Sequence, residues 1–339
     1  MSRRAVILLI VAIAIAAAIA WHTIRRGDHV VVVYVSEDQV FSEPVLKDFE
    51  RDTGIVVRAV YDTEETKSAG VMNRLIAEKS NPQADVYWAN EPIRAEVLRT
   101  SGVAAPYRSP SAEGIPDRFR DPQGYWTGFS ARARMLIVSK GARNKPASIL
   151  AYTDPRFRGK AAIANPLFGT TTAHVAALFA LWGDERGNAF LEAMRKNDVK
   201  IVSSNGESAD QVAAGSFQFA LADSDDVYSR QKQGGSVEGI YPDQEPNGIG
   251  CFIVPNAVVL VNGGPHPEAG KKLIDYLLSR ETEKKLAYSD AAQIPLHDGV
   301  ETPPSVGRLD TLKIMNVSYA QVAAKMQAIQ PRLKDWVGH

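Results

Sequence analysis

Several acidic side chains of this sequence follow predicted strands, at the sheet edge where loops gather. They are Glu37, Asp38, Glu91, Asp223, Asp225 and Asp226. Carboxylates that meet in one place repel each other unless a cation or an arginine lies among them. They therefore either bind a cationic ligand, a hard metal ion or an amine, or pair with arginines and helix N-termini. Acidic surface loops without a ligand are the third interpretation.

Two arginines lie inside one predicted strand, which covers residues 126–138. Arg132 and Arg134 alternate with Ala131 and Ala133, so both point to the same side of that strand. A strand arginine at a hinge either pairs with acidic groups and holds two lobes together, or projects toward a ligand as an anion clamp. The spacing leaves both roles open.

A run of threonines stands between a predicted strand, 161–164, and an apolar helix, 173–182. Thr170 and Thr171 are in the predicted loop between them. Free backbone N–H groups, hydroxyl donors and the positive end of a helix together suit an anion or a carboxylate. One of the threonines is also expected to cap the helix, which is the structural alternative.

Other polar residues complete the candidate ligand set. Asn205 and Gly206 repeat the threonine arrangement more weakly, in a turn predicted at 205–208 before a short helix, and helix capping alone would explain them. Ser36 and Asn90 stand beside the carboxylates that follow the first and third strands.

Common enzyme signatures are missing from the sequence. It contains no Gly-rich phosphate loop, GxGxxG, HExxH, GxSxG or CxxC pattern. The six histidines are scattered, and His174, on an apolar helix, is interpreted as a structural residue. No catalytic residue is therefore predicted, and an exported hydrolase that uses paired carboxylates as acid and base is the alternative from a different class.

The order of elements predicts an α/β fold made of two doubly wound lobes joined by hinge strands. The first lobe alternates strands at 30–35, 55–61 and 85–88 with helices at 40–49, 62–79 and up to 98. The second has strands at 161–164, 200–203 and 217–222 with helices between them. Strands at 251–254 and 257–261, helices at 267–278 and 282–287, and a tail at 317–336 broken by Pro331 complete the chain. Loops at the carboxyl ends of such strands are expected to face each other across a cleft.

Composition limits the classes of partner. The 339 residues contain 39 Lys and Arg and 39 Asp and Glu, which argues against a nucleic-acid surface that depends on basic excess. The one cysteine, Cys251, excludes an intramolecular disulfide framework and a multi-cysteine metal site.

The first residues predict export from the cytoplasm. Arg3 and Arg4 precede an apolar run over residues 5–21, so residues 1–27 are interpreted as a signal peptide and the body as periplasmic or extracytoplasmic. The run is also just long enough for an uncleaved membrane anchor. In that case a membrane-tethered sensor or scaffold is a further alternative.

The ordered segments of the chain resemble the solute-binding proteins of bacterial ABC importers, and most nearly the ferric-iron-binding subgroup of the type 2 periplasmic fold. The resemblance covers about residues 29–300 and is carried by VVVYVSEDQVFSEPVLKDFERDTGIVV, ADVYWANEP, WTGFSARARMLIV, FALADSDDVY, VPNAVVLV and AQIPL. It implies a monomeric ligand trap that does no chemistry and docks on an inner-membrane permease with its ATPase. The lobes are then expected at 28–130 plus 251–300, and at 131–250 plus 301–339.

The resemblance also implies a ligand set for Fe(III) with a synergistic anion as the transported ligand. The residues that match the metal positions are Asp38, Asn90 or Glu91, Asp225 and Asp226; those that match the anion positions are Arg132 or Arg134, Thr170 and Thr171. The sequence departs from the subgroup because Asp225 and Asp226 replace its adjacent tyrosine pair, although Tyr228 is close by. A thiamine-like, polyamine or phosphonate solute is therefore the alternative ligand.

Overall fold

The computed structural model describes residues 29–62 and 69–338. The predicted signal segment, 1–27, and the predicted start of a helix at 63–65 lie outside these residues. Within the described part, none of the helices combines the length and apolar composition that crossing a bilayer requires.

The first lobe is built on three parallel strands that pair in the order β2-β1-β3. Its elements are β1 (Val30–Val35), α2 (Gln39–Thr53), β2 (Val56–Tyr61), α3 (Ala69–Ala77), β3 (Val86–Ala89), α4 (Pro92–Thr100) and β4 (Ala104–Ala105). The sequence of β1, VVVVYV, is β-branched apart from one tyrosine, which suits a strand covered on both faces. The carboxyl ends of β1 and β3 thus place Glu37 and Glu91 at the same edge.

The second lobe repeats this arrangement with the parallel order β8-β6-β7. Its elements are β6 (Ala161–Ala164), α5 (Gly169–Trp182), α6 (Asp184–Lys196), β7 (Lys200–Val202), α7 (Asn205–Ala213), β8 (Phe219–Asp223), α8 (Ser224–Lys232) and β9 (Val237–Ile240). Helices α5, α7 and α8 each begin at the carboxyl end of one of these strands, so their N-termini converge.

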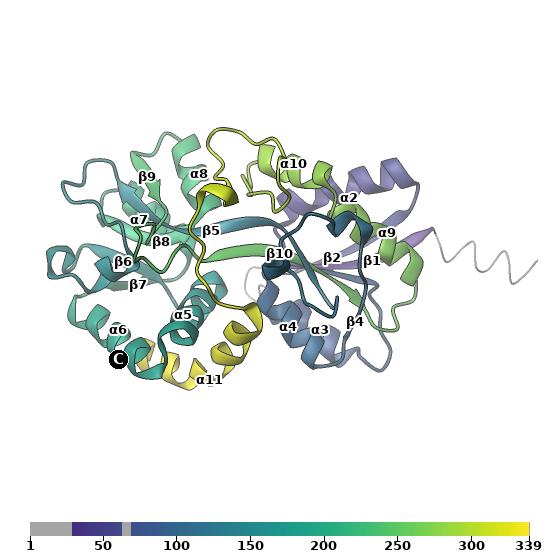
Figure 1. Cartoon of the computed structure of the whole chain (residues 1–339), viewed down its shortest axis with the longest axis horizontal. Coiled ribbons are helices and arrows are strands. Elements are labelled where there is room, and N and C mark those ends of the chain that lie inside the picture. The colour runs from purple at the N-terminus through teal and green to yellow at the C-terminus, as the bar shows by residue number, and fades with distance from the viewer. Residues whose placement is uncertain (1–28, 63–68, 339) are drawn as a thin grey trace, which may run out of the picture.

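Two long antiparallel strands, β5 (Thr127–Ser139) and β10 (Ile253–Val261), run between the lobes (Figure 1). The first half of β5 pairs with β10, whereas its second half pairs with β8 and β9 in the other lobe. The register of β5 and β10 shifts between Pro255 and Asn256. These strands are the hinge that the sequence predicts, and Arg132 and Arg134 lie on either side of the point where β5 changes partners.

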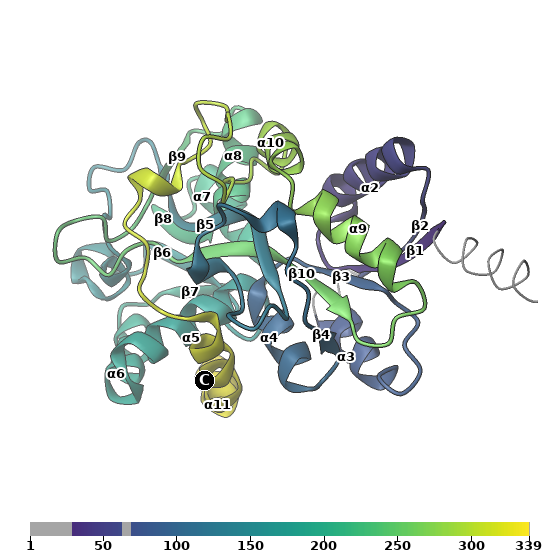
Figure 2. The same cartoon turned by 45° about the vertical axis from the view of Figure 1, so that its right-hand side comes forward.

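Three further helices pack against the sheet or against the junction of the two lobes. They are α9 (Pro267–Leu277), α10 (Arg280–Tyr288) and α11 (Tyr319–Gly338), with short 3-10 turns at Pro110–Ala112, Asp117–Phe119, Ile149–Thr153, Pro155–Phe157 and Leu309–Thr311. Helix α11 packs against α5 of the second lobe and α4 of the first, and both views show it beneath the junction (Figures 1 and 2).

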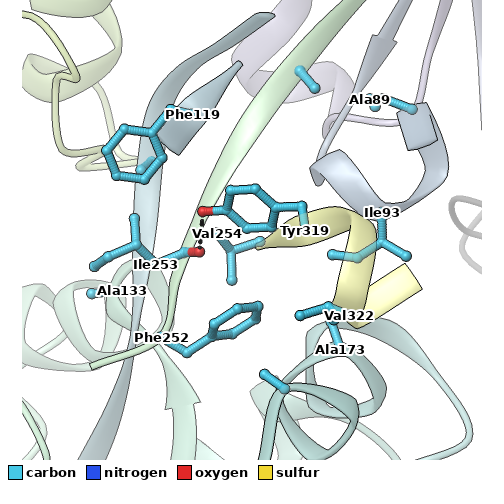
Figure 3. Close-up of a cluster of buried hydrophobic side chains, with 14 of the residues drawn as sticks. Ala89, Ile93, Phe119, Ala133, Ala173, Phe252, Ile253, Val254, Tyr319 and Val322 are labelled. Atoms are coloured by element: carbon cyan, nitrogen blue, oxygen red, sulfur yellow. Dashed lines mark hydrogen bonds between the residues drawn. The ribbon is translucent and has the colours of Figure 1, made fainter. Parts of the chain in front are cut away.

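A cluster of buried side chains joins the lobes below the hinge (Figure 3). Ile93 comes from α4, Ala173 from α5, and Tyr319 and Val322 from α11, and Phe252 directly precedes β10. The Tyr319 hydroxyl donates to the backbone oxygen of Ile253 at 2.8 Å, which satisfies a carbonyl inside this cluster. The hydrophobic core is therefore continuous across the lobe boundary.

Four details of the sequence-based prediction were wrong. Thr170 and Thr171 belong to the first turn of α5, not to a loop, and Asn205 opens α7. Pro331 lies inside a continuous α11. In place of the two strands predicted at 251–254 and 257–261 the structure has one strand, β10. Its pairing with β5 shifts register between Pro255 and Asn256 without ending the strand.

Candidate functional site

Arg134 is fully buried and is the centre of a polar network in the second lobe. Its Nη1 donates to Thr170 Oγ1 and Asp223 Oδ1, both at 2.9 Å, and its Nη2 donates to Thr171 Oγ1 at 2.9 Å. Asn205 Nδ2 donates to Thr170 Oγ1 at 2.8 Å and to Asp223 Oδ2 at 3.2 Å. The structure thus brings these five predicted residues together, but their polar groups bond to one another.

Arg132 lies between the two lobes. Its Nη2 donates to the backbone oxygen of Asn90, and its Nη1 is 3.9 Å from Glu37 Oε2. Burial opposes its ionisation, but the carboxylates Glu37, Asp225, Asp223 and Asp38 outweigh burial and raise the pKa of Arg132 above its usual value. Arg132 is therefore surrounded by carboxylates from both lobes.

Three aspartates meet at the N-terminus of α8. Carboxylate oxygens of Asp223, Asp225 and Asp226 all lie within 4.8 Å of one another. Asp223 and Asp226 form a capping box, in which each side chain accepts from the other residue's backbone N–H. Part of this acidic cluster therefore has a structural role as a helix cap.

The three aspartates differ in pKa because their neighbours differ. Burial opposes ionisation of Asp223, but Arg134 and Arg132 outweigh it and hold its pKa below the usual range. Burial raises the pKa of Asp225 to about 6, and burial together with Asp225 and Asp223 raises the pKa of Asp226 to about 8. The structure thus places the partly exposed Asp225 carboxyl near Arg132, with the partly exposed Asp226 carboxyl next to Asp225.

The first-lobe residues are less uniform. Glu91 caps α4, with Oε2 accepting from Ile93 N at 2.6 Å and Oε1 from Arg94 N at 3.1 Å. Burial raises the pKa of Glu91 above its usual value, against the opposing effect of Arg94. Asp38 is partly exposed at the start of α2.

Two of the predicted residues have their bonds elsewhere. Ser36 is buried and its hydroxyl bonds to Asp62 Oδ2 at 3.0 Å and Tyr87 Oη at 2.9 Å, toward the neighbouring strands. The backbone oxygen of Gly206 accepts from Arg230 Nη2 at 3.1 Å.

Tyr228 makes no hydrogen bond to the acidic cluster within the described residues and lies beside a separate cavity. It lines a cavity of about 160 Å³ together with Met135 and Tyr241, and Ala292, Ile294 and segment 305–307 form part of that cavity's wall. His174 is buried and burial, aided by the charge of Arg134, lowers its pKa to about 3. It is therefore neutral, which fits the structural role predicted for it.

One residue in contact with the site was not predicted. Gln293 Nε2 donates to Glu37 Oε1 at 2.9 Å. It belongs to the AQIPL motif, which carries part of the family resemblance. Gln293 does not follow a predicted strand, so the sequence gives no direct reason to expect its contact with Glu37. The only hint in the sequence is a polar residue within an otherwise apolar motif.

The chain belongs to the bacterial extracellular solute-binding protein family, whose model matches residues 30–288. Members of this family bind solutes and are not enzymes, so the exported hydrolase is set aside. The chain is similar to the iron uptake protein A1 of Synechocystis sp., at 27% identity over 272 residues, which cover 74% of this chain and 73% of that protein. It is also similar to a protein of Salmonella typhimurium named as 2-aminoethylphosphonate-binding and periplasmic, at 26% identity over 281 residues and 81% and 80% coverage.

The apo ferric ion-binding protein A of Pasteurella haemolytica has the same fold. The two structures superpose with a TM-score of 0.80 at 23% sequence identity, over 91% of this chain and 98% of that one. The type 2 periplasmic fold expected from the sequence is thereby confirmed.

Proposed function

We propose that the protein is the solute-binding component of an ABC importer and that its solute carries positive charge. The proposal depends chiefly on one observation: carboxyls from both lobes surround Arg132, those of Asp38 and Asp225 are partly exposed, and the pKa values of Asp225 and Asp226 are raised to about 6 and about 8. A cation among these groups would relieve their mutual repulsion. Asp38 and Asp225, one from each lobe, would contact it.

Ferric iron is the first candidate solute. A small, highly charged cation prefers oxygen donors, and the three aspartates at α8 supply them within 4.8 Å. The name of the iron uptake relative supports this choice. A synergistic anion would be accepted at the N-termini of α5 and α7.

An organic solute with an ammonium group is the second candidate. Two considerations favour it: the resemblance to the ferric-binding subgroup implies a tyrosine pair where this chain has Asp225 and Asp226, and a relative is named for 2-aminoethylphosphonate, which carries both an ammonium and an anionic group. The carboxyls would hold the ammonium group.

The rest of the biology follows from the proposed role. The chain would be exported by residues 1–27, would act as a monomer outside the cytoplasm, and would deliver its solute to an inner-membrane permease driven by an ATPase subunit. No nucleic acid is expected as a partner. We assign residues 28–130 plus 251–300 to one lobe and 131–250 plus 301–339 to the other.

The solute is tested on full-length protein purified without chelators. Elemental analysis and native mass spectrometry identify what co-purifies, and calorimetric titration compares ferric citrate with 2-aminoethylphosphonate. We expect Asp225→Asn to weaken binding of the recognised probe by about tenfold, ~1.4 kcal/mol. Asp290→Asn, which removes an exposed carboxylate paired with Lys232 at the far end of α8, is the control and should bind like wild type. Equal affinity of Asp225→Asn and wild type would contradict the proposed site.

A further inference from the structure

A chain of buried side chains runs from the hinge strands to Glu37. Trp88 Nε1 donates to Asn256 Oδ1 at 3.1 Å. Asn256 Nδ2 donates to the backbone oxygen of Ser130 at 2.6 Å and to Gln293 Oε1 at 2.8 Å. Gln293 Nε2 then donates to Glu37 Oε1 at 2.9 Å. Asn256 and Gln293 are fully buried, so water does not compete for these bonds.

The direction of this chain is determined at its hinge end. The indole N–H of Trp88 can only donate and the carbonyl of Ser130 can only accept, so the Asn256 amide has one orientation that satisfies both. Its Nδ2 consequently faces Gln293 Oε1, which turns the Gln293 N–H toward Glu37. The Gln293 amide therefore presents a donor to the carboxylate.

The hinge end is also where the backbone is strained. Ser130 is fully buried inside β5 and has φ of 38°, in the left-handed region that non-glycine residues rarely adopt. Such a conformation costs on the order of 1–3 kcal/mol and persists only where its surroundings hold it. Its N–H donates to Glu283 Oε1 at 2.8 Å and its carbonyl accepts from Asn256, opposite the register shift of β10.

The site end of the chain is Arg132. Glu37 Oε2 lies 3.9 Å from Arg132 Nη1, so the carboxylate that Gln293 holds is one of those acting on the guanidinium between the lobes. Gln293 itself is attached to β5, because its neighbour Ile294 exchanges backbone hydrogen bonds with Ala131, each at 2.7 Å. A change in the path of β5 would therefore move the amide that orients Glu37.

We propose that Gln293 is a positioning residue that orients Glu37, and through it Arg132, according to the conformation of β5 at Ser130. This inference rests on the proposed function, because it assigns Gln293 to the solute site described above. Gln293 contacts the carboxylate, not the solute. The Gln293 amide thereby couples the relative position of the two lobes to the orientation of the Glu37 and Arg132 side chains.

The affinity test uses three variants of the full chain. Gln293→Leu keeps the approximate volume and removes both hydrogen bonds, and we expect it to weaken binding of ferric citrate or 2-aminoethylphosphonate, whichever the wild type binds, at least fivefold. Asn197→Leu is the control: Asn197 is equally buried and donates to the backbone oxygens of Tyr152 and Asp154, both at 3.0 Å, inside the second lobe. It should lose stability to a similar degree and bind like wild type.

Gln293→Glu separates positioning from simple loss of stability. At pH 7.5 the introduced carboxyl faces Glu37 and repels it, so binding should be weak. At pH 5.5 the introduced carboxyl and Glu37 share one proton, which supplies the hydrogen bond that the Gln293 amide donates in the wild type. The affinity of Gln293→Glu, relative to wild type at the same pH, should therefore recover. The proposal would be overturned if the ratio of the Gln293→Glu affinity to the wild-type affinity were the same at pH 7.5 and pH 5.5. It would also be overturned if Gln293→Leu bound with wild-type affinity.

Amide hydrogen exchange gives a readout that needs no solute. In Gln293→Leu we expect exchange to rise together in segments 36–38 and 128–134, at least tenfold, while segment 161–164 of β6 stays as in wild type. If neither probe binds the wild-type protein, the proposed solutes fail, and unchanged exchange at 36–38 would independently overturn the coupling.

Discussion

Neighbouring charges decide what each aspartate of the α8 N-terminus does. Asp223 bonds to Arg134, Thr170 and Asn205, so it is ionised and occupied. Asp225 and Asp226, two and three residues further on, have no arginine bonded to them within the described residues and their pKa values are raised. The sequence shows three aspartates within four residues and does not distinguish them. Their different roles become clear only from the positions of Arg132 and Arg134 on β5 and of Thr170 on α5.

The raised pKa values of Asp225 and Asp226 predict a pH dependence of the solute-free protein. Since the folded state binds protons more tightly than the unfolded state, these groups stabilise the fold fully below about pH 4, and that contribution is lost as pH rises through about 6 and then about 8. Binding of a cation should release these protons, so affinity should increase from pH 5 to pH 8. Calorimetric titration in two buffers of different ionisation enthalpy measures the released protons, and no proton release would contradict the prediction. Asp226→Asn should flatten both profiles.

Helix N-termini are the elements that build the site. Thr170, Thr171 and Asn205 were expected in loops, because glycine and hydroxyl residues before an apolar run are typical of a loop or a cap, but they lie in the first turns of α5 and α7. In the structure α5 begins at Gly169, whose φ of 60° turns the chain into the helix, and Phe168, which precedes it, offers no cap. The hydroxyls of Thr170 and Thr171 instead accept hydrogen bonds from Arg134, which is more than 30 residues away in the sequence.

Glu91 illustrates the same point and gives a prediction at this scale. It accepts from two N–H groups of the first turn of α4, so Glu91→Ala should lower the free energy of unfolding by about 1 kcal/mol. Glu91→Gln keeps one acceptor oxygen and should restore most of this loss in urea titrations. If Glu91→Gln instead weakens solute binding more than fivefold at unchanged stability, Glu91 is a ligand residue and not only a cap.

At the scale of the molecule, the sequence predicted two α/β lobes and a charged hinge strand, and β5, which pairs with strands of both lobes, agrees with that prediction. Strand periodicity and the alternation of strands with helices were sufficient for that, since each βα unit is local. The buried relay through Asn256 and Gln293 was not predictable. Asn256 and Gln293 are 37 residues apart, Asn256 is 168 residues from Trp88, and Gln293 is 256 residues from Glu37, so no local pattern indicates that they are bonded.

The position of α11 across the junction predicts a strong effect of its last turn on stability. Trp336 is buried and its indole N–H donates to the backbone oxygen of Leu191 at 2.9 Å. Trp336→Ala should therefore lower the free energy of unfolding by about 3–5 kcal/mol. Lys334→Ala, at an exposed position of the same helix, should stay within about 0.5 kcal/mol of wild type. Similar losses in the two variants, measured by calorimetry, would show that α11 is not packed as described.

The buried cysteine has a practical consequence for following lobe movement. Cys251 is the only cysteine of the chain, it is fully buried with its thiol bonded to the backbone oxygen of Arg134 at 3.0 Å, and burial raises its pKa far above the usual value. Because the thiolate is the reactive form, Cys251 of the native protein should not react with maleimides at neutral pH. A fluorophore or spin label can then be attached to cysteines introduced on the two lobes while Cys251 stays in place, which makes this chain a ready scaffold for an optical sensor of its own solute.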